Sequence, residues 1–573
     1  LHDALPICFA QDLQEEKAKF KLTDLPYDWR CFKPVYVEKN IYEENNVQHL
    51  WDLLVTGKIN FNILQKNLNN DEYIISREEL SKINPLDYKV INVHSNLGNG
   101  KTTSILKQAY IWSKHYRVFI LKQNDTNISN DLMKISKIKE KKILIIEDYT
   151  FYQDVLKKIK VYLDGSYTLL LTSRSFVNEQ YEKQIPSLLD IDEKDIKRIN
   201  LNYLSSTELS KVSSLLQKLY LSKILLETKS QVKKNIIKNK QLSNILLDLL
   251  SSEPISNEID KIYEKIEGNN KALQILCATM INNFVTLGIN PSDLFSLVDV
   301  TTNDIENIRD EGIKEILNVG NGDVTLQSSV FARYLVSKKS IYSNLMSTMK
   351  KILMNSRLLS KEDEKRVCEK LISQSNIKLV FTGLESTKKT DSAAENVVRY
   401  FDDIVELRNH KDNIFFWLQY GMACMDIKQY PRSRNYLNIS YELAQKSEEK
   451  GYVFETYQID TQFARLLLEE NIYLSKEPKD KINDFFEANS KLEKAIKQRF
   501  SQARLAYKQM ILYKPFISKN LKYFSDDEIK KIGTTIDNHL KNKWFKTNGK
   551  ENEEMRKILE NCKQQILRFI AKN

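Results

Sequence analysis

Glycine, proline and cysteine are all scarce in this chain of 573 residues. With 14 glycines and 10 prolines, the composition favours a helix-rich protein with short connections. The six cysteines are far apart in the sequence, with no C-x-x-C pair and no histidine at metal-ligand spacing. This spacing argues against a disulfide framework and against a cysteine zinc site, and it favours a reducing compartment. We therefore expect a cytoplasmic protein.

Long apolar runs are also missing. No run reaches the roughly 18 residues that a membrane-spanning helix needs. The apolar stretch "SNILLDLL" at residues 243–250 has the pattern of a helix face. The sequence therefore predicts no membrane partner.

Positive charge is in excess, but it is spread out. The chain has 87 basic and 76 acidic residues, which gives a net charge of +11. This sign suits nucleic acid, yet the lysines are distributed along the whole chain, which favours a solvated surface. The densest basic run, at residues 229–240, carries Val232, Ile236 and Ile237 at helical spacing. Nucleic acid is a less favoured partner that the composition leaves open.

The chain begins with Leu1 rather than Met. Its first seven residues, "LHDALPI", lack the features of a secretory signal and resemble translated sequencing adapter. We expect the natural N-terminus, and a domain ahead of it, to be missing.

The pattern of apolar residues changes once along the chain. Five short apolar runs alternate with helical patterns, which is typical of a parallel sheet covered by helices on both faces. From Ser206 onward the pattern is helical, apart from the strand-like start of "DVTLQSSVFARYLV" at residues 323–336. The expected strands are residues 88–93, 118–121, 143–146, 168–171 and 196–201.

The stretch "SNLGNGKTT" at residues 95–103 lies between the first expected strand and a helical pattern. It matches the phosphate-binding pattern G-x-x-x-x-G-K-[ST], except that Ser95 replaces the first glycine. In such a loop the backbone N–H groups surround phosphate oxygens, a lysine reaches the β- and γ-phosphates, and a hydroxyl binds Mg²⁺. Lys101 and Thr102 are the candidates for these last two roles. The residues expected to bind ATP with Mg²⁺ are Ser95, Asn96, Leu97, Gly98, Asn99, Gly100, Lys101, Thr102 and Thr103.

Two further motifs follow later strands. "ILIIEDYT" places Glu147 and Asp148 after an apolar run, where a carboxylate can hold Mg²⁺ together with Thr102. One acid would take the magnesium position and the other would activate water, with Glu147 and Asp148 in either order. "LLLTSRS" ends the fourth expected strand with Arg174, whose guanidinium can distinguish a triphosphate from a diphosphate. The candidate catalytic residues are therefore Glu147, Asp148 and Arg174.

The last third of the chain contains a repeat. Residues 415–446 fit the tetratricopeptide helix–turn–helix spacing, with Trp417, Gly421 and Leu437 at characteristic positions. "IDTQFARLLLEEN" starts a weaker second copy and "SQARLAYKQMILY" a weaker third copy. Such helical stacks commonly bind proteins on a concave surface, so we expect a protein ligand here.

In this order, "SNLGNGKTT", "ILIIEDYT" and "LLLTSR" resemble the STAND class of signal-transducing P-loop NTPases. The resemblance implies a sheet order of 5-1-4-3-2, a helical lid, and oligomerisation on activation. It also implies that residues 266–276, with Asn270 where a proline is usual, bring a helix N-terminus near Gly268 to the nucleotide. The tail is similar to the repeat tails of bacterial antiphage STAND proteins, whose N-terminus is often a sirtuin-like NADase.

Together these features predict an α/β P-loop NTPase followed by an all-α lid, a winged-helix-like arm and an α-solenoid. The Glu-Asp order and the lack of a separate water-positioning residue predict slow ATP hydrolysis, which suits a switch in antiphage sensing. A DNA-handling ATPase, with Ser328, Ser329, Arg333, Lys338 and Lys339 meeting phosphates, and a non-hydrolysing scaffold are the alternatives. The expected domains are an N-terminal linker or remnant of an upstream domain (1–80), the NTPase (81–205), the lid (206–300), the arm (301–390) and the repeats (391–573).

Overall fold

The computed structural model describes residues 29–38, 46–162, 167–222, 240–307, 317–320, 323–326, 328–337, 341–382, 390–408, 410–500, 503–546 and 550–572. These residues form two compact units. The first unit lies within residues 1–370 and 382–385, and the second within residues 371–381 and 386–573.

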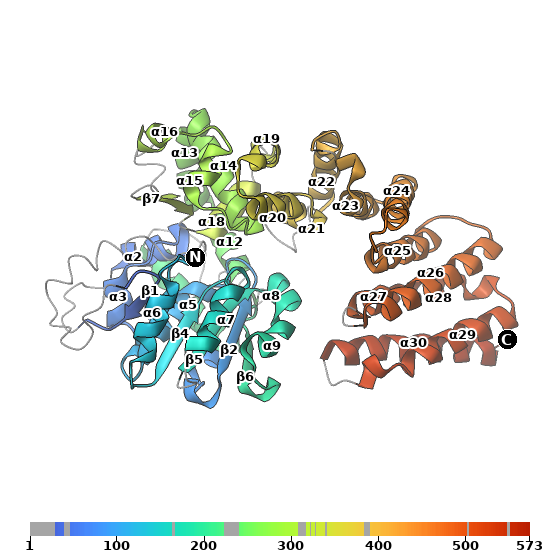
Figure 1. Cartoon of the computed structure of the whole chain (residues 1–573), viewed down its shortest axis with the longest axis horizontal. Coiled ribbons are helices and arrows are strands. Elements are labelled where there is room, and N and C mark those ends of the chain that lie inside the picture. The colour runs from blue at the N-terminus through green and yellow to red at the C-terminus, as the bar shows by residue number, and fades with distance from the viewer. Residues whose placement is uncertain are drawn as a thin grey trace. The chain divides into compact units, whose positions relative to one another are not determined.

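The first unit is built around a six-stranded sheet with the order β1-β3-β4-β5-β2-β6 (Figure 1). Five strands are parallel and match the five expected apolar runs, with ends shifted by at most three residues. Counted along the chain from the strand before the glycine loop, these five lie in the order 5-1-4-3-2. They are β2 (Val90–Ser95), β3 (Arg117–Leu121), β4 (Lys142–Ile146), β5 (Tyr167–Arg174) and β6 (Ile196–Asn200).

The complete sheet differs from the expected one by a sixth strand. This strand, β1 (Phe32–Val35), pairs antiparallel with β3 at the edge of the sheet. The described part of segment 1–80 is therefore not a linker, because it completes the sheet and its core. Ile63, Leu64 and Tyr73 are buried against α5 (Lys101–Ser113) on one face of the sheet.

Helices cover both faces of the sheet, as expected for buried parallel strands. One face packs on α5, while the other packs on α6 (Ile128–Ser136), α7 (Gln153–Tyr162) and α9 (Ile185–Leu189). Single helical turns and short helices complete this part: α2 (Val47–Trp51), η1 (Asp52–Thr56), α3 (Phe61–Lys66), α4 (Glu78–Ser81), η2 (Pro85–Asp87), η3 (Tyr149–Phe151), α8 (Ser175–Tyr181), η4 (Glu182–Gln184) and η5 (Glu193–Asp195).

The rest of the first unit is mainly helical. Helices α12 and α18 lie between the sheet and the helices α13 to α16 (Figure 1). A two-stranded antiparallel sheet precedes α18, which confirms the expected strand and helix of residues 323–336. Most of the basic run 229–240 lies outside the described residues. The elements are α10 (Ser206–Ser222), α12 (Leu242–Leu250), α13 (Glu253–Glu267), α14 (Asn270–Val285), α15 (Pro291–Ser296), α16 (Thr302–Asn307), β7 (Leu317–Gly320), β8 (Asp323–Leu326), α18 (Ser329–Ser337), α19 (Tyr342–Asn355), η7 (Ser356–Leu358) and α20 (Lys361–Leu371).

The second unit is helical throughout its described residues. Helices α23 (Ile414–Asp426) and α24 (Tyr430–Glu449) form the expected helix–turn–helix, and they pack closely at Gly421. A Cβ added to Gly421 would lie 3.0 Å from the Leu437 side chain, so the small residue permits the close approach. The remaining elements are α21 (Gln374–Thr382), α22 (Thr390–Ile404), η8 (His410–Asp412), α25 (Tyr457–Tyr473), α26 (Pro478–Gln498), α27 (Ala503–Gln509), η10 (Met510–Leu512), α28 (Tyr513–Asn520), η11 (Leu521–Tyr523), α29 (Asp526–Leu540), η12 (Lys543–Lys546) and α30 (Lys550–Lys572).

Within the described ranges, no helix is both long enough and apolar enough to cross a bilayer.

Candidate nucleotide site

The glycine loop joins β2 to α5 and turns at two glycines. Gly98 and Gly100 have φ angles of +80° and +73°, a backbone conformation that favours glycine. Ser95 is the last residue of β2, so its backbone is extended and does not require glycine. The departure from the usual pattern therefore falls at a strand position, where the backbone tolerates a side chain.

Polar side chains hold the loop from two sides. The Asn202 Oδ1 atom accepts hydrogen bonds from the Asn96 backbone N–H at 2.5 Å and from Asn99 Nδ2 at 3.3 Å. The Asn99 Oδ1 atom accepts from the Ser243 N–H at 3.1 Å, which ties the start of α12 to the loop. Asn202 also donates to Ser175 Oγ at 3.0 Å. The loop conformation is thus fixed by residues far apart in the sequence.

The Arg77 side chain also holds the loop in place. Its guanidinium donates to the Asn99 carbonyl at 3.3 Å and to the carbonyls of Leu201 and Tyr203 at 3.1 and 2.8 Å. Its Nε atom lies 3.3 Å from the Glu208 carboxylate, and both side chains are buried. Burial lowers the pKa of Arg77, while Glu208 raises it. This buried pair joins the loop, the end of β6 and the start of α10.

The side chains expected to handle phosphate and metal come together at the carboxyl edge of the sheet. The Lys101 Nζ atom donates to Thr172 Oγ1 at 3.2 Å and lies 3.7 Å from the Asp148 carboxylate. The Thr102 hydroxyl donates to Glu147 Oε2 at 3.4 Å. Lys101, Thr102, Glu147 and Asp148 are all buried. The structure therefore places Glu147 at Thr102, and Asp148 at Lys101.

Lys122 adds a positive charge beside this group. It follows β3 and faces Glu147 from the neighbouring strand. Burial lowers the pKa of Lys122 to about 8, and the Glu147 carboxylate opposes that change. Glu147 is thus within electrostatic range of a cation as well as near the Thr102 hydroxyl.

Arg174 ends β5 directly beside Ser95, its register partner in β2. Its guanidinium donates to the Phe284 carbonyl at 2.6 Å and also to the Asn283 carbonyl. These acceptors belong to the last turn of α14, where backbone carbonyls lack partners within the helix. Arg174 therefore joins the sheet edge to the carboxyl end of α14.

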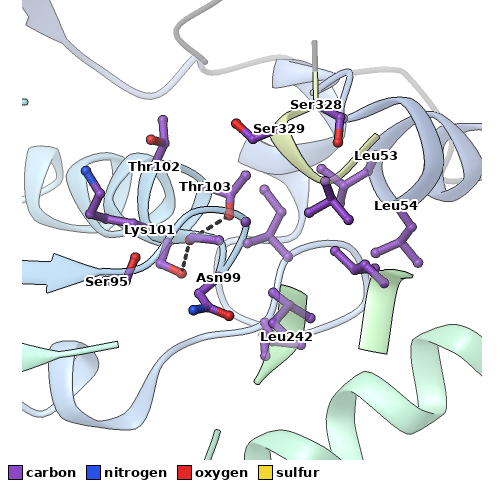
Figure 2. A pocket seen from close by; sticks show the side chains of 18 of the residues that line it. Leu53, Leu54, Ser95, Asn99, Lys101, Thr102, Thr103, Leu242, Ser328 and Ser329 are labelled. Atoms are coloured by element: carbon purple, nitrogen blue, oxygen red, sulfur yellow. Dashed lines mark hydrogen bonds between the residues drawn. The ribbon is translucent and has the colours of Figure 1, made fainter. Parts of the chain in front are cut away.

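A cavity of about 150 Å³ lies against the glycine loop. One part is polar and contains all nine loop residues expected to bind the nucleotide, together with Arg77, Ser104, Arg174, Ser328 and Ser329. Figure 2 shows Leu53 and Leu54 on the far side of the loop from Lys101 and Thr102. The apolar part is lined by Leu53, Leu54, Tyr73, Ile74, Ile75, Val212, Leu215, Leu216, Leu242, Leu246 and Val330.

Helices α12 and α18 close on this loop. A Cβ added to Gly98 would lie 2.7 Å from Val330 Cγ2, and one added to Gly100 would lie 3.0 Å from Leu242 Cδ2. Arg333 Nη1 donates to the Leu97 carbonyl at 2.9 Å. Arg333 is buried by this contact, so it does not present its side chain to DNA, and Lys338 and Lys339 lie outside the described residues.

The segment expected to form the lid contacts the site through a different helix end than expected. Gly268 and Asn270 do not line the cavity, and the end of α14 that meets the site is its carboxyl end. The physical reason is the guanidinium of Arg174, which is attracted to the negative end of the helix dipole. The expected approach of a helix N-terminus at residues 266–276 is therefore wrong for the described structure.

Three residues that hold the glycine loop were not predicted from the sequence. They are Arg77, Asn202 and Arg333, the last of which was expected to contact DNA phosphates instead. Arg77 offered a signal, because "YIISREEL" at residues 73–80 places three charged residues shortly after an apolar run that precedes β2. Asn202 and Arg333 offered none, since their partners Asn96 and Leu97 lie more than a hundred residues away.

Magnesium fits the donor atoms that the site offers. The Thr102 hydroxyl and the Glu147 carboxylate are hard oxygen ligands at the mouth of the loop. Among the described residues there is no cluster of three or more His, Cys, Asp or Glu side chains that would hold a metal. Mg²⁺ commonly takes only one or two protein carboxylates and completes its shell with phosphate and water.

Comparison with known proteins adds little. No family model matches the chain, and no curated protein matches it. A solved STAND (Signal Transduction ATPase with Numerous Domains) protein with a tetratricopeptide repeat sensor, from Pyrococcus horikoshii, is 12% identical and covers 87% of this chain and 84% of its own. The TM-score of that match is 0.23, which is too low to support a conclusion about fold or function.

Proposed function

We propose that this chain binds ATP with Mg²⁺ and uses the bound nucleotide as a conformational switch. The observation that carries the proposal is the convergence of Lys101, Thr102, Glu147 and Asp148 on a loop whose two glycines have positive φ angles. Such a loop directs backbone N–H groups toward an anion, and the start of α5 adds the positive end of its helix dipole.

Each polar residue then has a role set by its neighbours. Lys101 would bind the β- and γ-phosphates, as its amine already lies among polar oxygens. Thr102 and Glu147 would hold Mg²⁺, which neutralises phosphate charge when bound. Asp148 would act on the attacking water, and Arg174 would bind the terminal phosphate. The apolar part of the cavity would take the adenine base.

Slow hydrolysis is part of the proposal. Asp148 lies 3.7 Å from Lys101, and this attraction holds the carboxylate near the loop. A carboxylate held by the lysine that would bind phosphate is poorly placed to accept a proton from the attacking water. Long residence of the triphosphate suits a switch, because the nucleotide then stabilises one domain arrangement for an extended time.

The closed contacts of α12 and α18 suggest what the nucleotide changes. The cavity of about 150 Å³ is smaller than the roughly 300 Å³ from which ligand pockets usually start. Val330 on Gly98 and Arg333 on the Leu97 carbonyl occupy the approach to the loop. We infer that a triphosphate enters as α18 withdraws, so that binding and opening are linked.

The second unit would supply the signal. Its stacked helix pairs suit a protein ligand, and ligand binding there would favour opening and assembly of several copies. We propose bacterial antiphage sensing as the biological setting, on the sequence resemblance of the repeat tail alone.

Calorimetry with purified protein tests the proposal. Wild-type protein is expected to bind ATP in the presence of Mg²⁺, and Lys101→Ala to weaken that binding by roughly a hundredfold, because the lysine makes charge-assisted bonds to two phosphates. The matched control is Lys114→Ala, which removes an exposed lysine at the end of the same helix and should leave binding unchanged.

Two outcomes decide between the alternatives. Equal ATP affinity in wild type and Lys101→Ala would contradict the proposal. Firm binding by wild type without any measurable phosphate release over hours would instead favour the non-hydrolysing scaffold, in which the nucleotide is purely structural.

A further inference from the structure

The segment between α3 and α4 forms one wall of the apolar part of the cavity. Residues 67–77 of this segment belong to no helix or strand. Tyr73, Ile74 and Ile75 nevertheless line the cavity and are buried. A segment without regular backbone hydrogen bonds keeps its position only through other contacts. Those contacts therefore decide where this wall lies relative to the glycine loop.

Lys107 of α5 holds this segment at three acceptors. Its Nζ atom donates to the Asn70 carbonyl at 2.6 Å, to the Ile74 carbonyl at 2.7 Å and to Asp71 Oδ1 at 3.1 Å. The lysine side chain is only 2% exposed. An ammonium group has three donors, and a buried one is costly unless they are satisfied. Here all three acceptors belong to the same short segment.

Asp71 extends these contacts to α10. Its carboxylate also accepts a hydrogen bond from the Ser76 N–H, and its Oδ2 atom lies 2.7 Å from Lys211 Nζ. Lys211 belongs to α10, which lines the same apolar part through residues that include Val212 and Leu215. One carboxylate thus connects two elements that form the apolar part of the cavity, and a buried lysine connects that carboxylate to α5.

Apolar packing also acts on this wall. Tyr73 and Ile74 belong to the buried cluster that contains Leu106 and Tyr110 of α5. Packing of this kind has no preferred direction, whereas hydrogen bonds depend on angle as well as distance. The packing therefore keeps the segment against α5, and the Lys107 contacts fix which backbone groups of the segment face the helix.

The same helix carries residues of the phosphate side. Thr103 and Ser104 of α5 line the cavity, and Lys107 is one helical turn beyond Thr103. One helix therefore bears the glycine loop at its start and holds the apolar wall through Lys107. A nucleotide needs both parts at a fixed separation, because its base and its phosphates are covalently joined.

We propose that Lys107 is a positioning residue for the base of the bound nucleotide. Lys107 does not line the cavity, so it acts through Asp71 and the Ile74 carbonyl rather than on the ligand. The inference rests on the proposed function, since it takes the apolar part of the cavity as the base subsite. It adds that affinity for a nucleotide and affinity for a bare phosphate chain depend on different residues of this site.

The experiment compares ATP with inorganic tripolyphosphate, which carries three phosphates and no base. Calorimetry of the full chain with Mg²⁺ measures both affinities. Lys107→Met is expected to weaken ATP binding about tenfold and to change tripolyphosphate binding less than about twofold, because only the base subsite is displaced. The matched control is Lys160→Met on α7, which covers the other face of the sheet; its side chain is 44% exposed and lies 3.3 Å from Asp190. It should change neither affinity.

A second variant decides the matter if Lys107→Met folds poorly. Lys211→Met removes the partner of Asp71 on α10, and the Lys211 side chain is 40% exposed. ATP affinity should fall about threefold, again with tripolyphosphate affinity unchanged. Parallel losses for both ligands, or no loss of either, would overturn the inference and leave apolar packing to hold the segment.

Wild-type protein separates this inference from the proposed function. We expect it to bind ATP more tightly than tripolyphosphate. Equal affinity for the two ligands would overturn the inference alone, because the glycine loop would still bind phosphate while the base contributed nothing. Binding of neither ligand would overturn the proposed function, and this inference with it.

Discussion

Buried charge is arranged differently in the two units. In the first unit, Lys101, Glu147, Asp148 and Arg174 are buried within one group at the carboxyl edge of the sheet. Lys101 lies 3.7 Å from the Asp148 carboxylate, and the Thr102 hydroxyl donates to Glu147 at 3.4 Å. Clusters of buried charged groups are typical of ligand sites in proteins.

In the second unit, buried charges bridge neighbouring helices one at a time. Asp460 accepts from Tyr441 at 2.6 Å and from Thr456 at 2.7 Å, and it lies 3.1 Å from Lys494. Glu470 is likewise bound by two cations, Arg434 from α24 and Lys476 from the loop after α25. These contacts lie between neighbouring segments of the helical stack and hold it together.

The largest expected effect is the loss of stability of the first unit when the Arg77 side chain is removed. Arg77→Ala leaves Glu208 buried without its cation and leaves three carbonyls without a donor, so the first unit should lose about 3–5 kcal/mol of stability. Denaturant unfolding of the full chain measures this loss. The control is Glu470→Ala, whose partner Arg434 is 37% exposed and regains water, so the loss in the second unit should be smaller. Equal losses would contradict the comparison.

Acid should weaken the second unit through His539. Burial lowers the pKa of His539 to about 4, below the ordinary value of 6.5. The unfolded chain therefore binds a proton that the folded chain does not, and stability falls as pH drops from about 6.5 to about 4, by roughly 3 kcal/mol in total.

Thermal melts between pH 7 and pH 4 measure this effect. His539→Gln, which keeps a polar side chain near Asn489, should flatten the pH dependence of the second unit. The same slope in the variant and in wild type would assign the acid sensitivity to other groups.

Two glycines with similar backbone angles, one in each unit, differ in how closely other side chains surround them. Gly98 and Gly451 have φ angles of +80° and +86°, but only Gly98 is enclosed, with Val330 Cγ2 at 2.7 Å from an added Cβ. Gly451→Ala should cost only the backbone strain of about 1–2 kcal/mol. Gly98→Ala should cost this strain plus the displacement of Val330, and it should weaken ATP binding at least several-fold. Unfolding and calorimetry of both variants would contradict the assignment if ATP binding were unchanged in Gly98→Ala.

The sequence predicted the parts of this site that depend on local pattern. The five apolar runs are rich in branched residues and lie in the sheet interior, so their strands were predictable. The turn of the loop between β2 and α5 was predictable because Gly98 and Gly100 can adopt the positive φ angles that the turn requires. β1 was not predictable, since "FKPV" contains a proline that is tolerated only at a sheet edge.

Contacts between distant segments account for the remainder. Arg333 binds the loop from 236 residues away, and Arg174 binds the end of α14 from 109 residues away. Helical periodicity identifies which residues share a face, but it does not tell which end of a helix meets another domain. This is why the expectation at Gly268 was wrong while α14 itself lies at the site.

Hydrogen exchange of the full chain, with and without Mg²⁺ and ATP, tests the central claim most directly. If a triphosphate binds the glycine loop and displaces α18, amides of residues 96–103 should exchange more slowly and those of 329–337 faster. Unchanged exchange in both segments at saturating ATP would contradict the account.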